Sequence, residues 1–168
     1  ETCHLAVRDR CSVLYIDKVL GTHNITVQGA RIGTRLECHC TAVGKVLLAF
    51  ASDDIVDKCL SSAALTKRTA RTISTAAQFR QELAEVARRG HAYDLGEAVD
   101  DVHCVAAPIR DEFGQVVAAL SLSAPVTRFE KQQSLYTGAV REAALEVGRA
   151  LVDSSRDHSG AGDEDYPR

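Results

Sequence analysis

The segment ECHCTAVGKVLLAF, residues 37–50, gathers the side chains in this sequence that are best suited to chemistry. Cys38, His39 and Cys40 offer thiol and imidazole groups, which can hold a metal or form a nucleophile with its base. Gly44 and Lys45 follow closely, and a Gly-Lys pair ends the phosphate-binding loop motif. Each of these chemistries requires further residues at defined spacings.

The phosphate-loop motif requires a glycine five residues before its Gly-Lys pair and a serine or threonine after the lysine. Those positions hold His39 and Val46, so the motif is absent. We therefore interpret Gly44 as a glycine at a helix entry and Lys45 as a solvated side chain.

A structural zinc site usually combines two ligand pairs with recognisable spacing. His103 and Cys104 form the nearest second pair, but neighbouring residues on a strand face opposite sides, so only one of them could join a given site. Free cysteines are among the most buried residue types. We therefore expect Cys38 and Cys40 to be small buried thiols on one strand face, and we expect no metal or other cofactor.

A cysteine nucleophile is the corresponding enzymatic interpretation. His103 and Cys104 cannot pair with each other for the same geometric reason, which leaves only His39 with Cys104 across the fold. A catalytic cysteine needs an identifiable activating group, and no third orienting residue stands out. We expect the chain not to be an enzyme, while a cysteine- or metal-dependent enzyme stays open as an alternative.

Ser121 and Ser123 alternate with Leu120 and Leu122 in the segment VAALSLSAP. On a strand this alternation places two leucines on one face and two hydroxyls on the other. A solvated face of an antiparallel sheet is the ordinary explanation. The functional explanation is that the two hydroxyls line a concavity and donate hydrogen bonds to a ligand.

Thr41 has the position of a helix N-cap, because a helical apolar pattern begins directly after it. The first N–H groups of a helix lack partners and carry partial positive charge, so they can bind an anion. Ala42, Val43 and Gly44 have small or short side chains that leave these amides accessible. If the serine strand faces this helix start, the two features form a pocket for a small acid.

The apolar pattern predicts the elements that position these residues. Expected strands lie at residues 2–7, 11–19, 91–95, 104–109 and 115–124, with a shorter one near 25–27. Expected helices lie at residues 41–51, 53–62, 76–89 and 130–152, and Gly90 ends the third of them. This order predicts an α+β fold with a mixed, mainly antiparallel sheet flanked by helices.

The composition, with 168 residues of which 45% are apolar, predicts one compact domain. The net charge is −3 and the basic residues do not cluster, whereas a protein that reads duplex DNA usually has a basic footprint. No run of 18 apolar residues exists, so we expect no membrane span. The chain contains no methionine, and we expect it to be a domain excised from a longer protein.

Six cysteines stand at positions 3, 11, 38, 40, 59 and 104. Their spacing lacks the pattern of a disulfide framework, so we expect six reduced thiols in a cytoplasmic protein. The last residues, 153–168, are polar and contain glycine, and we expect a disordered tail there.

Together these residues resemble the IclR-type transcriptional regulators. The similarity includes, in order, ETCHLAV, LECHCTAVGKVLLAF, LTKRTARTI, ELAEVARRGHAYD, CVAAPIRDEFGQVVAALSLSAP and the final helix. It implies an effector-binding domain over residues 1–152 with a GAF/PAS-like fold, which in the family follows a DNA-binding winged helix-turn-helix. It also implies a small organic or aromatic acid as effector, and assembly as a homodimer or homotetramer. A ligand-free oligomerisation domain is the remaining alternative.

The resemblance also implies which residues bind the effector. They are Ala42, Val43 and Gly44 at the helix start, Asp94 after the glycine-ended helix, Val102 and Cys104 on the next strand, and Ser121 and Ser123 on the hydroxyl strand. A ligand hydroxyl could donate to Asp94, which would favour hydroxy-acids. Glu37, Asp101 and Ala124 depart from the usual family residues, which leaves the identity of the effector open.

Overall fold

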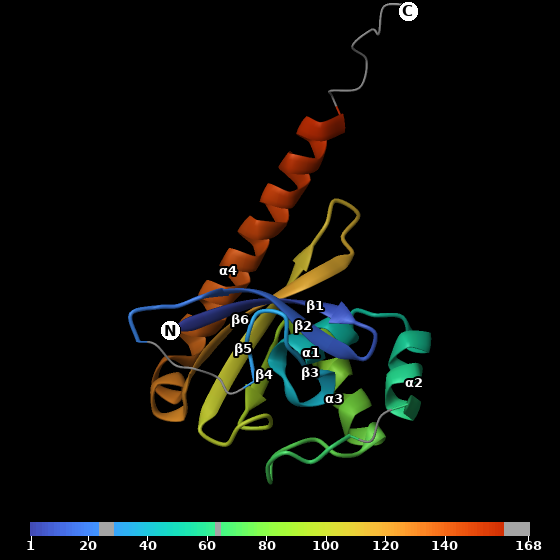
Figure 1. The fold of residues 1–168 in the computed structure, drawn as a ribbon, viewed down its shortest axis with the longest axis vertical. Coiled ribbons are helices and arrows are strands. Elements are labelled where there is room, and N and C mark those ends of the chain that lie inside the picture. The colour runs from blue at the N-terminus through green and yellow to red at the C-terminus, as the bar shows by residue number, and fades with distance from the viewer. Residues whose placement is uncertain (24–28, 63–64, 160–168) are drawn as a thin grey trace, which may run out of the picture.

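A single six-stranded sheet with helices on both faces forms the body of the molecule (Figure 1). The computed structural model describes residues 1–23, 29–62 and 65–159. The strands are β1 Thr2–Asp9, β2 Ser12–Val19, β3 Arg35–Glu37, β4 Ala92–Leu95, β5 Val102–Arg110 and β6 Val116–Pro125. Their order is β3-β2-β1-β6-β5-β4, and every pairing between these strands is antiparallel. The expected α+β class is confirmed, with an antiparallel sheet in place of a mixed one.

The described residues form four α-helices, α1 Ala42–Ala49, α2 Asp53–Ser62, α3 Ala76–Arg89 and α4 Val126–Ser159, of which α1 and α4 pack on the sheet. One face of the sheet packs against α4, which continues past the sheet edge, while α1 packs on the other face with α3 against it (Figure 1). These two faces are called here the α4 face and the α1 face.

The period of two along each strand divides its residues between the two faces. On β5, for example, Val105 and Ala107 belong to the core under α4, while Cys104 and Ala106 belong to the core under α1. Each face therefore has a separate core built from alternate residues of the same strands. The polar residues of the strands fall mainly on the α1 face.

The two helix starts expected from the sequence are confirmed. The Thr41 hydroxyl accepts a hydrogen bond from the Gly44 amide at 3.2 Å, and the Thr75 hydroxyl accepts one from the Gln78 amide at 3.3 Å. Gly44 also has to be a glycine, because a Cβ atom there would lie 2.3 Å from the Cα atom of Cys38. Close approach of α1 to the preceding turn therefore fixes the residue at this position.

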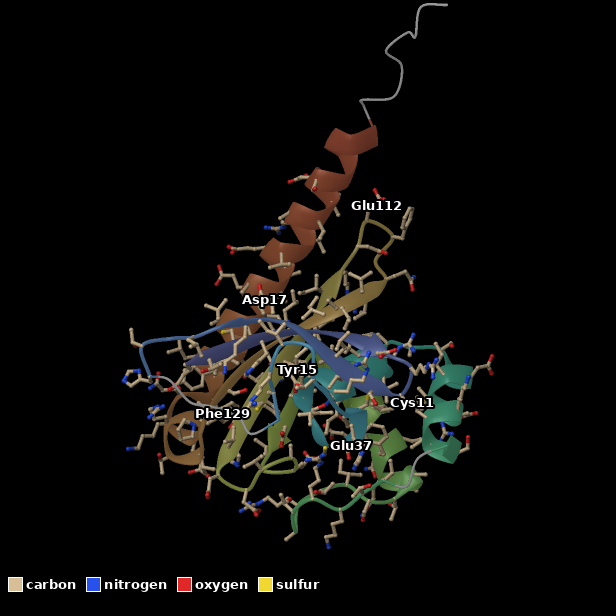
Figure 2. All side chains as sticks on the ribbon, in the orientation of Figure 1. Cys11, Tyr15, Asp17, Glu37, Glu112 and Phe129 are labelled. Atoms are coloured by element: carbon tan, nitrogen blue, oxygen red, sulfur yellow. A yellow bond between two sulfur atoms is a disulfide. The ribbon has the colours of Figure 1, made fainter. Side chains whose placement is uncertain are left out.

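The expectation of six free thiols is wrong. Cys11 and Cys59 form a disulfide that joins the end of the β1–β2 hairpin to α2, and their Cα atoms lie 5.1 Å apart (Figure 2). The two residues are 48 positions apart in sequence. Composition and local spacing carry no information on such a contact, because only the packing of α2 beside the hairpin brings the cysteines together. Cys3, Cys38, Cys40 and Cys104 are free.

Two further expectations differ from the structure. Cys38–Cys40 forms a short 3₁₀ helix after β3, so the two cysteines do not share a strand face. Helix α4 begins at Val126 and runs through Ser159, and it includes the first residues of the expected tail. The short strand expected at 25–27 and the rest of the tail, 160–168, lie outside the described residues.

Candidate functional site

A small cavity lies between the start of α1 and the α1 face of the sheet. Its volume is about 20 Å³, which is room for one water molecule. It is lined by His4, Tyr15, Ala30, Leu36, Thr41, Ala42, Val43, Asp94, Ala98, Cys104, Ser121 and Ser123. The helix start and the serine strand line the same cavity, as the sequence hypothesis requires.

Six of the eight residues expected at the site line this cavity: Ala42, Val43, Asp94, Cys104, Ser121 and Ser123. Gly44 and Val102 do not. Gly44 lies against Cys38, and its amide is already bonded to the Thr41 hydroxyl. Val102 stands opposite Pro125 at the start of β5 and packs, half-buried, against the core of the α1 face.

Strand register places the cavity residues His4, Ser121, Ser123, Cys104 and Asp94 in two neighbouring rows. One row crosses the sheet from Thr2 through Ser123 and Cys104 to Asp94. The next row begins with His4 and Ser121 and continues into small alanines. Because residues paired across strands have Cβ atoms about 5 Å apart, each row is a continuous line of side chains.

The start of α1 closes the cavity opposite these rows. Helix geometry leaves the amides of Ala42 and Val43 without partners inside the helix, since each is too close to its N-terminus to reach a carbonyl one turn back. Both residues are buried and both line the cavity. The helix start, which carries these two amides and the positive end of the helix dipole, therefore lines the same cavity as Ser121 and Ser123.

Asp94 forms the far end of the first row and is 3% exposed. Its Oδ1 atom accepts hydrogen bonds from the amides of Glu97 at 2.6 Å and Ala98 at 3.3 Å. Burial raises the pKa of the Asp94 carboxyl to about 7, and these two amides oppose the shift. A carboxyl with this pKa is substantially protonated near neutral pH, so it can lie close to an anion.

The expectation that Lys45 is solvated is wrong. The side chain is 1% exposed, and its Nζ atom donates to the Tyr93 carbonyl at 2.9 Å and to the Glu97 carboxylate. Glu82 on α3 lies 3.7 Å from the same Nζ atom. Because α1 is covered by the sheet on one side and α3 on the other, Lys45 has no route to solvent. The lysine thus joins α1 to β4 and to the loop after β4, which carries Glu97.

The sequence interpretation missed the part of the cavity wall formed by β1, β2, β3 and the segment before β3. His4 and Tyr15 supply its polar groups, and their rings meet edge to face with centroids 5.5 Å apart. Figure 2 shows Tyr15 near the centre of the molecule. A signal for His4 was present, because Thr2, His4 and Ala6 alternate with Cys3, Leu5 and Val7 as a polar or small face against an apolar one.

A profile of the family described as "Bacterial transcriptional regulator IclR C-terminal" matches residues 1–149. The chain belongs to this family. The IclR-type effector-binding domain expected from the sequence is thereby confirmed, and membership places the chain among regulator domains and not among enzymes.

Individual relatives agree with the family assignment. The IclR domain is 35% identical over 148 residues to the HTH-type transcriptional regulator KdgR of Dickeya chrysanthemi, which covers 88% of this chain and 48% of that protein. The chain thus spans about half the length of the curated relatives it matches. The solved C-terminal domain of Escherichia coli KdgR is similar in fold, with a TM-score of 0.78 and 33% identity over 90% of this chain and 87% of that one.

A third relative was solved with a small molecule. It is an IclR homolog from Microbacterium hydrocarbonoxydans complexed with 4-hydroxybenzoate. Its TM-score to this IclR domain is 0.82 at 28% identity, over 90% of this chain and 60% of that one.

The thiols of the IclR domain are in surroundings that oppose nucleophilic chemistry. Burial raises the pKa of the Cys104 thiol well above its usual range and raises the pKa values of Cys38 and Cys40 to about 12. Cys104 lies 3.1 Å from the Ser123 hydroxyl, and His39 contacts the Thr66 carbonyl at 3.0 Å. Across residues 1–23, 29–62 and 65–159, no three His, Cys, Asp or Glu side chains are placed to hold a metal ion.

No helix in the described part of the chain is both long and apolar enough to cross a membrane.

Proposed function

We propose that this IclR domain senses a small organic or aromatic acid, which binds in the cavity between α1 and the sheet. The observation that carries the proposal is the meeting of two groups of donors around one cavity. The amides at the start of α1 lie on one side, and the hydroxyls of Ser121 and Ser123 lie on the other. The 4-hydroxybenzoate complex of the Microbacterium homolog supports an acid as the class of ligand.

In the proposed complex the ligand carboxylate accepts hydrogen bonds from the amides of Ala42 and Val43 and from the two serine hydroxyls. Neither arginine nor a metal is required, because a helix start binds anions through its free amides and dipole. Gly44 takes no part, since its amide is bonded to Thr41. Asp94 faces the ligand in its protonated form, which avoids repulsion between two carboxylates.

The size of the cavity adds a mechanical consequence. Ligand sites in proteins usually have volumes of roughly 300–1,000 Å³, whereas this cavity has about 20 Å³. An organic acid can therefore enter only if lining side chains move apart. The cavity wall includes residues of β1, β2, α1 and the loop after β4, so its expansion would shift elements on opposite sides of the site. We propose this expansion as the event that reports ligand binding to the rest of the protein.

The parent protein is proposed by analogy with longer relatives named as HTH-type transcriptional regulators. In it, an N-terminal winged helix-turn-helix would bind DNA in the cytoplasm, and the effector would modulate that binding. Homodimer or homotetramer assembly would present paired DNA-binding domains to two half-sites. The ligand-free oligomerisation domain is the competing function.

A binding experiment tests the site. A thermal-shift screen over organic and aromatic acids selects a ligand, and calorimetry then compares the wild type with the Ser121→Ala/Ser123→Ala double variant. A hydrogen bond to a charged group contributes roughly 1.5–3 kcal/mol, and each 1.4 kcal/mol is about a factor of ten in affinity. We expect the double variant to bind at least about tenfold more weakly with little change in stability.

The matched control is Ser134→Ala, because Ser134 is exposed on α4 and far from the cavity. It should bind like the wild type. Equal affinities of the wild type and the Ser121→Ala/Ser123→Ala variant would rule out the proposed carboxylate site. Failure of every acid to bind would favour the oligomerisation domain.

A further inference from the structure

His4 is a buried polar side chain whose hydrogen-bonding capacity is not used within the protein. It is 2% exposed on β1, and its Nε2 atom has no hydrogen-bond partner among the described residues. Two other buried side-chain atoms share this property, Glu97 Oε2 and His103 Nδ1, but neither residue lines the cavity. A buried polar group without a partner is unfavourable and rare in native proteins. The Nε2 atom of His4 therefore lacks a hydrogen-bond partner at the wall of a proposed ligand site.

The surroundings of His4 hold it neutral. Burial, together with the nearby charge of Lys18, lowers the pKa of the His4 imidazole to about 4. A neutral imidazole has one nitrogen that donates and one that accepts. A hydroxyl group can satisfy either nitrogen, because it can both donate and accept. A hydroxyl is thus the ligand group that fits His4 in either tautomer.

The ring of His4 is fixed in place. The edge-to-face contact with Tyr15 constrains it from β2, and pairing with Ser121 constrains its backbone within the sheet. Tyr15 also lines the cavity, beside the apolar side chains of Ala30 and Leu36. The β1–β2 side of the cavity therefore offers an apolar wall with one oriented, unpartnered nitrogen.

Asp94 is the other candidate partner for a ligand hydroxyl, and it lies at the opposite end of the cavity. The strand order puts three strand spacings between β1 and β4, which is roughly 14 Å between the backbones of His4 and Asp94. The Oδ1 atom of Asp94 already accepts two backbone hydrogen bonds. The His4 Nε2 atom accepts or donates none within the described chain. The unmet hydrogen bond thus favours His4.

We propose that His4 determines specificity by binding a hydroxyl group of the effector, so that the effector is a hydroxy-acid. The inference rests on the proposed function, because it assumes that the acid occupies the same cavity. The carboxylate lies at the start of α1 and the serines, and the ligand body extends along the apolar wall toward His4. An acid that lacks the hydroxyl leaves the His4 nitrogen unpaired in the complex, and the site discriminates against it.

The test uses pairs of probe acids that differ by one hydroxyl: benzoate with 3- and 4-hydroxybenzoate, and propionate with lactate. Calorimetry measures each affinity for the wild type and for His4→Phe, which retains a ring that can pack edge to face on Tyr15. We expect the wild type to prefer a hydroxylated member of at least one pair by tenfold or more. In His4→Phe this preference should fall to about one, with the affinity for the parent acid within threefold of the wild type. His4→Gln, which restores a hydrogen-bonding group, should recover part of the preference.

The outcomes separate this inference from the proposed function. If Ser121→Ala/Ser123→Ala weakens binding of the probes but His4→Phe leaves the preference for the hydroxyl intact, the role of His4 is wrong and the acid site stands. A preference lost in Asp94→Asn and retained in His4→Phe would assign the hydroxyl to Asp94. A wild-type protein without any preference in either series would also overturn the inference. Binding of none of these acids at millimolar concentration would overturn both proposals.

Discussion

The two faces of the sheet are built by alternate residues of the same strands, yet they differ sharply in chemistry. The α4 face is filled by aliphatic and aromatic side chains, with the Phe129 ring in contact with Tyr93, His103 and Tyr136. The α1 face buries an unusual number of polar groups, among them His4, Lys45, Asp94, Ser121 and Ser123. Buried polar groups are unfavourable unless paired, so stability alone does not account for this face.

This difference separates the structural face from the functional one. Apolar packing is the simplest way to stabilise a sheet, and the α4 face follows it except at the buried ring of His103, which packs on Phe129. The α1 face departs from local stability rules at the cavity, which is where such departures are expected to serve function. Within one strand, β6, Leu122 belongs to the first face and Ser121 and Ser123 to the second. The predictions below test whether the polar groups of the α1 face behave as this contrast requires.

The largest expected effect concerns Lys45, the cation buried in the α1 face. Lys45→Met preserves the length and apolar stem of the side chain but leaves the Glu97 carboxylate buried without its cation. Breaking a buried ion pair by removing one partner typically costs about 3–5 kcal/mol. Urea denaturation should show a loss in the free energy of unfolding of that size.

Two controls accompany this measurement. Lys58→Met alters an exposed lysine on α2 and should change stability by less than about 0.5 kcal/mol. The Lys45→Met/Glu97→Gln double variant should be more stable than Lys45→Met alone, because it no longer buries an unpaired charge. A loss below about 1 kcal/mol in Lys45→Met would mean that the pair contributes as little as an exposed ion pair does.

The next effect concerns the Cys11–Cys59 disulfide, which ties the hairpin end to α2 beside the α1 face. A bridge that closes a loop of this length typically stabilises a protein by roughly 2–4 kcal/mol. Reduction, or the Cys11→Ala/Cys59→Ala variant, should lower the free energy of unfolding by that amount. Reductant should have no effect on the variant. Alkylation of the unfolded protein without reductant should label four thiols, because Cys38, Cys40 and Cys104 are buried in the native state. Labelling of six would contradict the disulfide.

Local sequence patterns were sufficient for most elements, although not for β3, and for six of the residues that line the cavity. Alternation in VAALSLSAP assigned Ser121 and Ser123 to one face, and the cap position of Thr41 located the free amides of α1. Where the determining contact is distant in sequence, local patterns failed. Lys45 is buried because α3 covers α1, and Cys11 reaches Cys59 only through the packing of α2. The alternation that places His4 on the more polar face of β1 is visible in the sequence. Its functional significance depends on which face of β1 lines the cavity, and the sequence does not show this.

The smallest expected effect in stability tests Asp94. Its pKa is about 7 in the folded protein, against 3.8 for an unperturbed aspartate, because the carboxyl is buried. A carboxyl whose pKa is raised by folding stabilises fully below the unfolded pKa, and this contribution is lost as pH rises through the folded pKa. The wild type should therefore lose stability between about pH 4 and pH 7 relative to Asp94→Asn, whose amide does not titrate. Since one pKa unit corresponds to about 1.4 kcal/mol, the variant should be more stable than the wild type at pH 8 by at least about 1 kcal/mol.

Urea denaturation of both proteins at pH 5, 6, 7 and 8 measures the difference in their free energies of unfolding. The contributions of the other titrating groups largely cancel, because both proteins contain them. The asparagine oxygen can still accept from the amides of Glu97 and Ala98, so the loop after β4 should remain in place. Asp17→Asn, at an exposed position on β2, is the matched substitution measured beside it. A flat difference for Asp94→Asn would show that Asp94 titrates as in the unfolded chain, and the α1 face would then contain no destabilised acid. A difference that rises with pH would show that the Asp94 carboxyl at the cavity destabilises the domain, and that replacing it with an amide increases the free energy of unfolding.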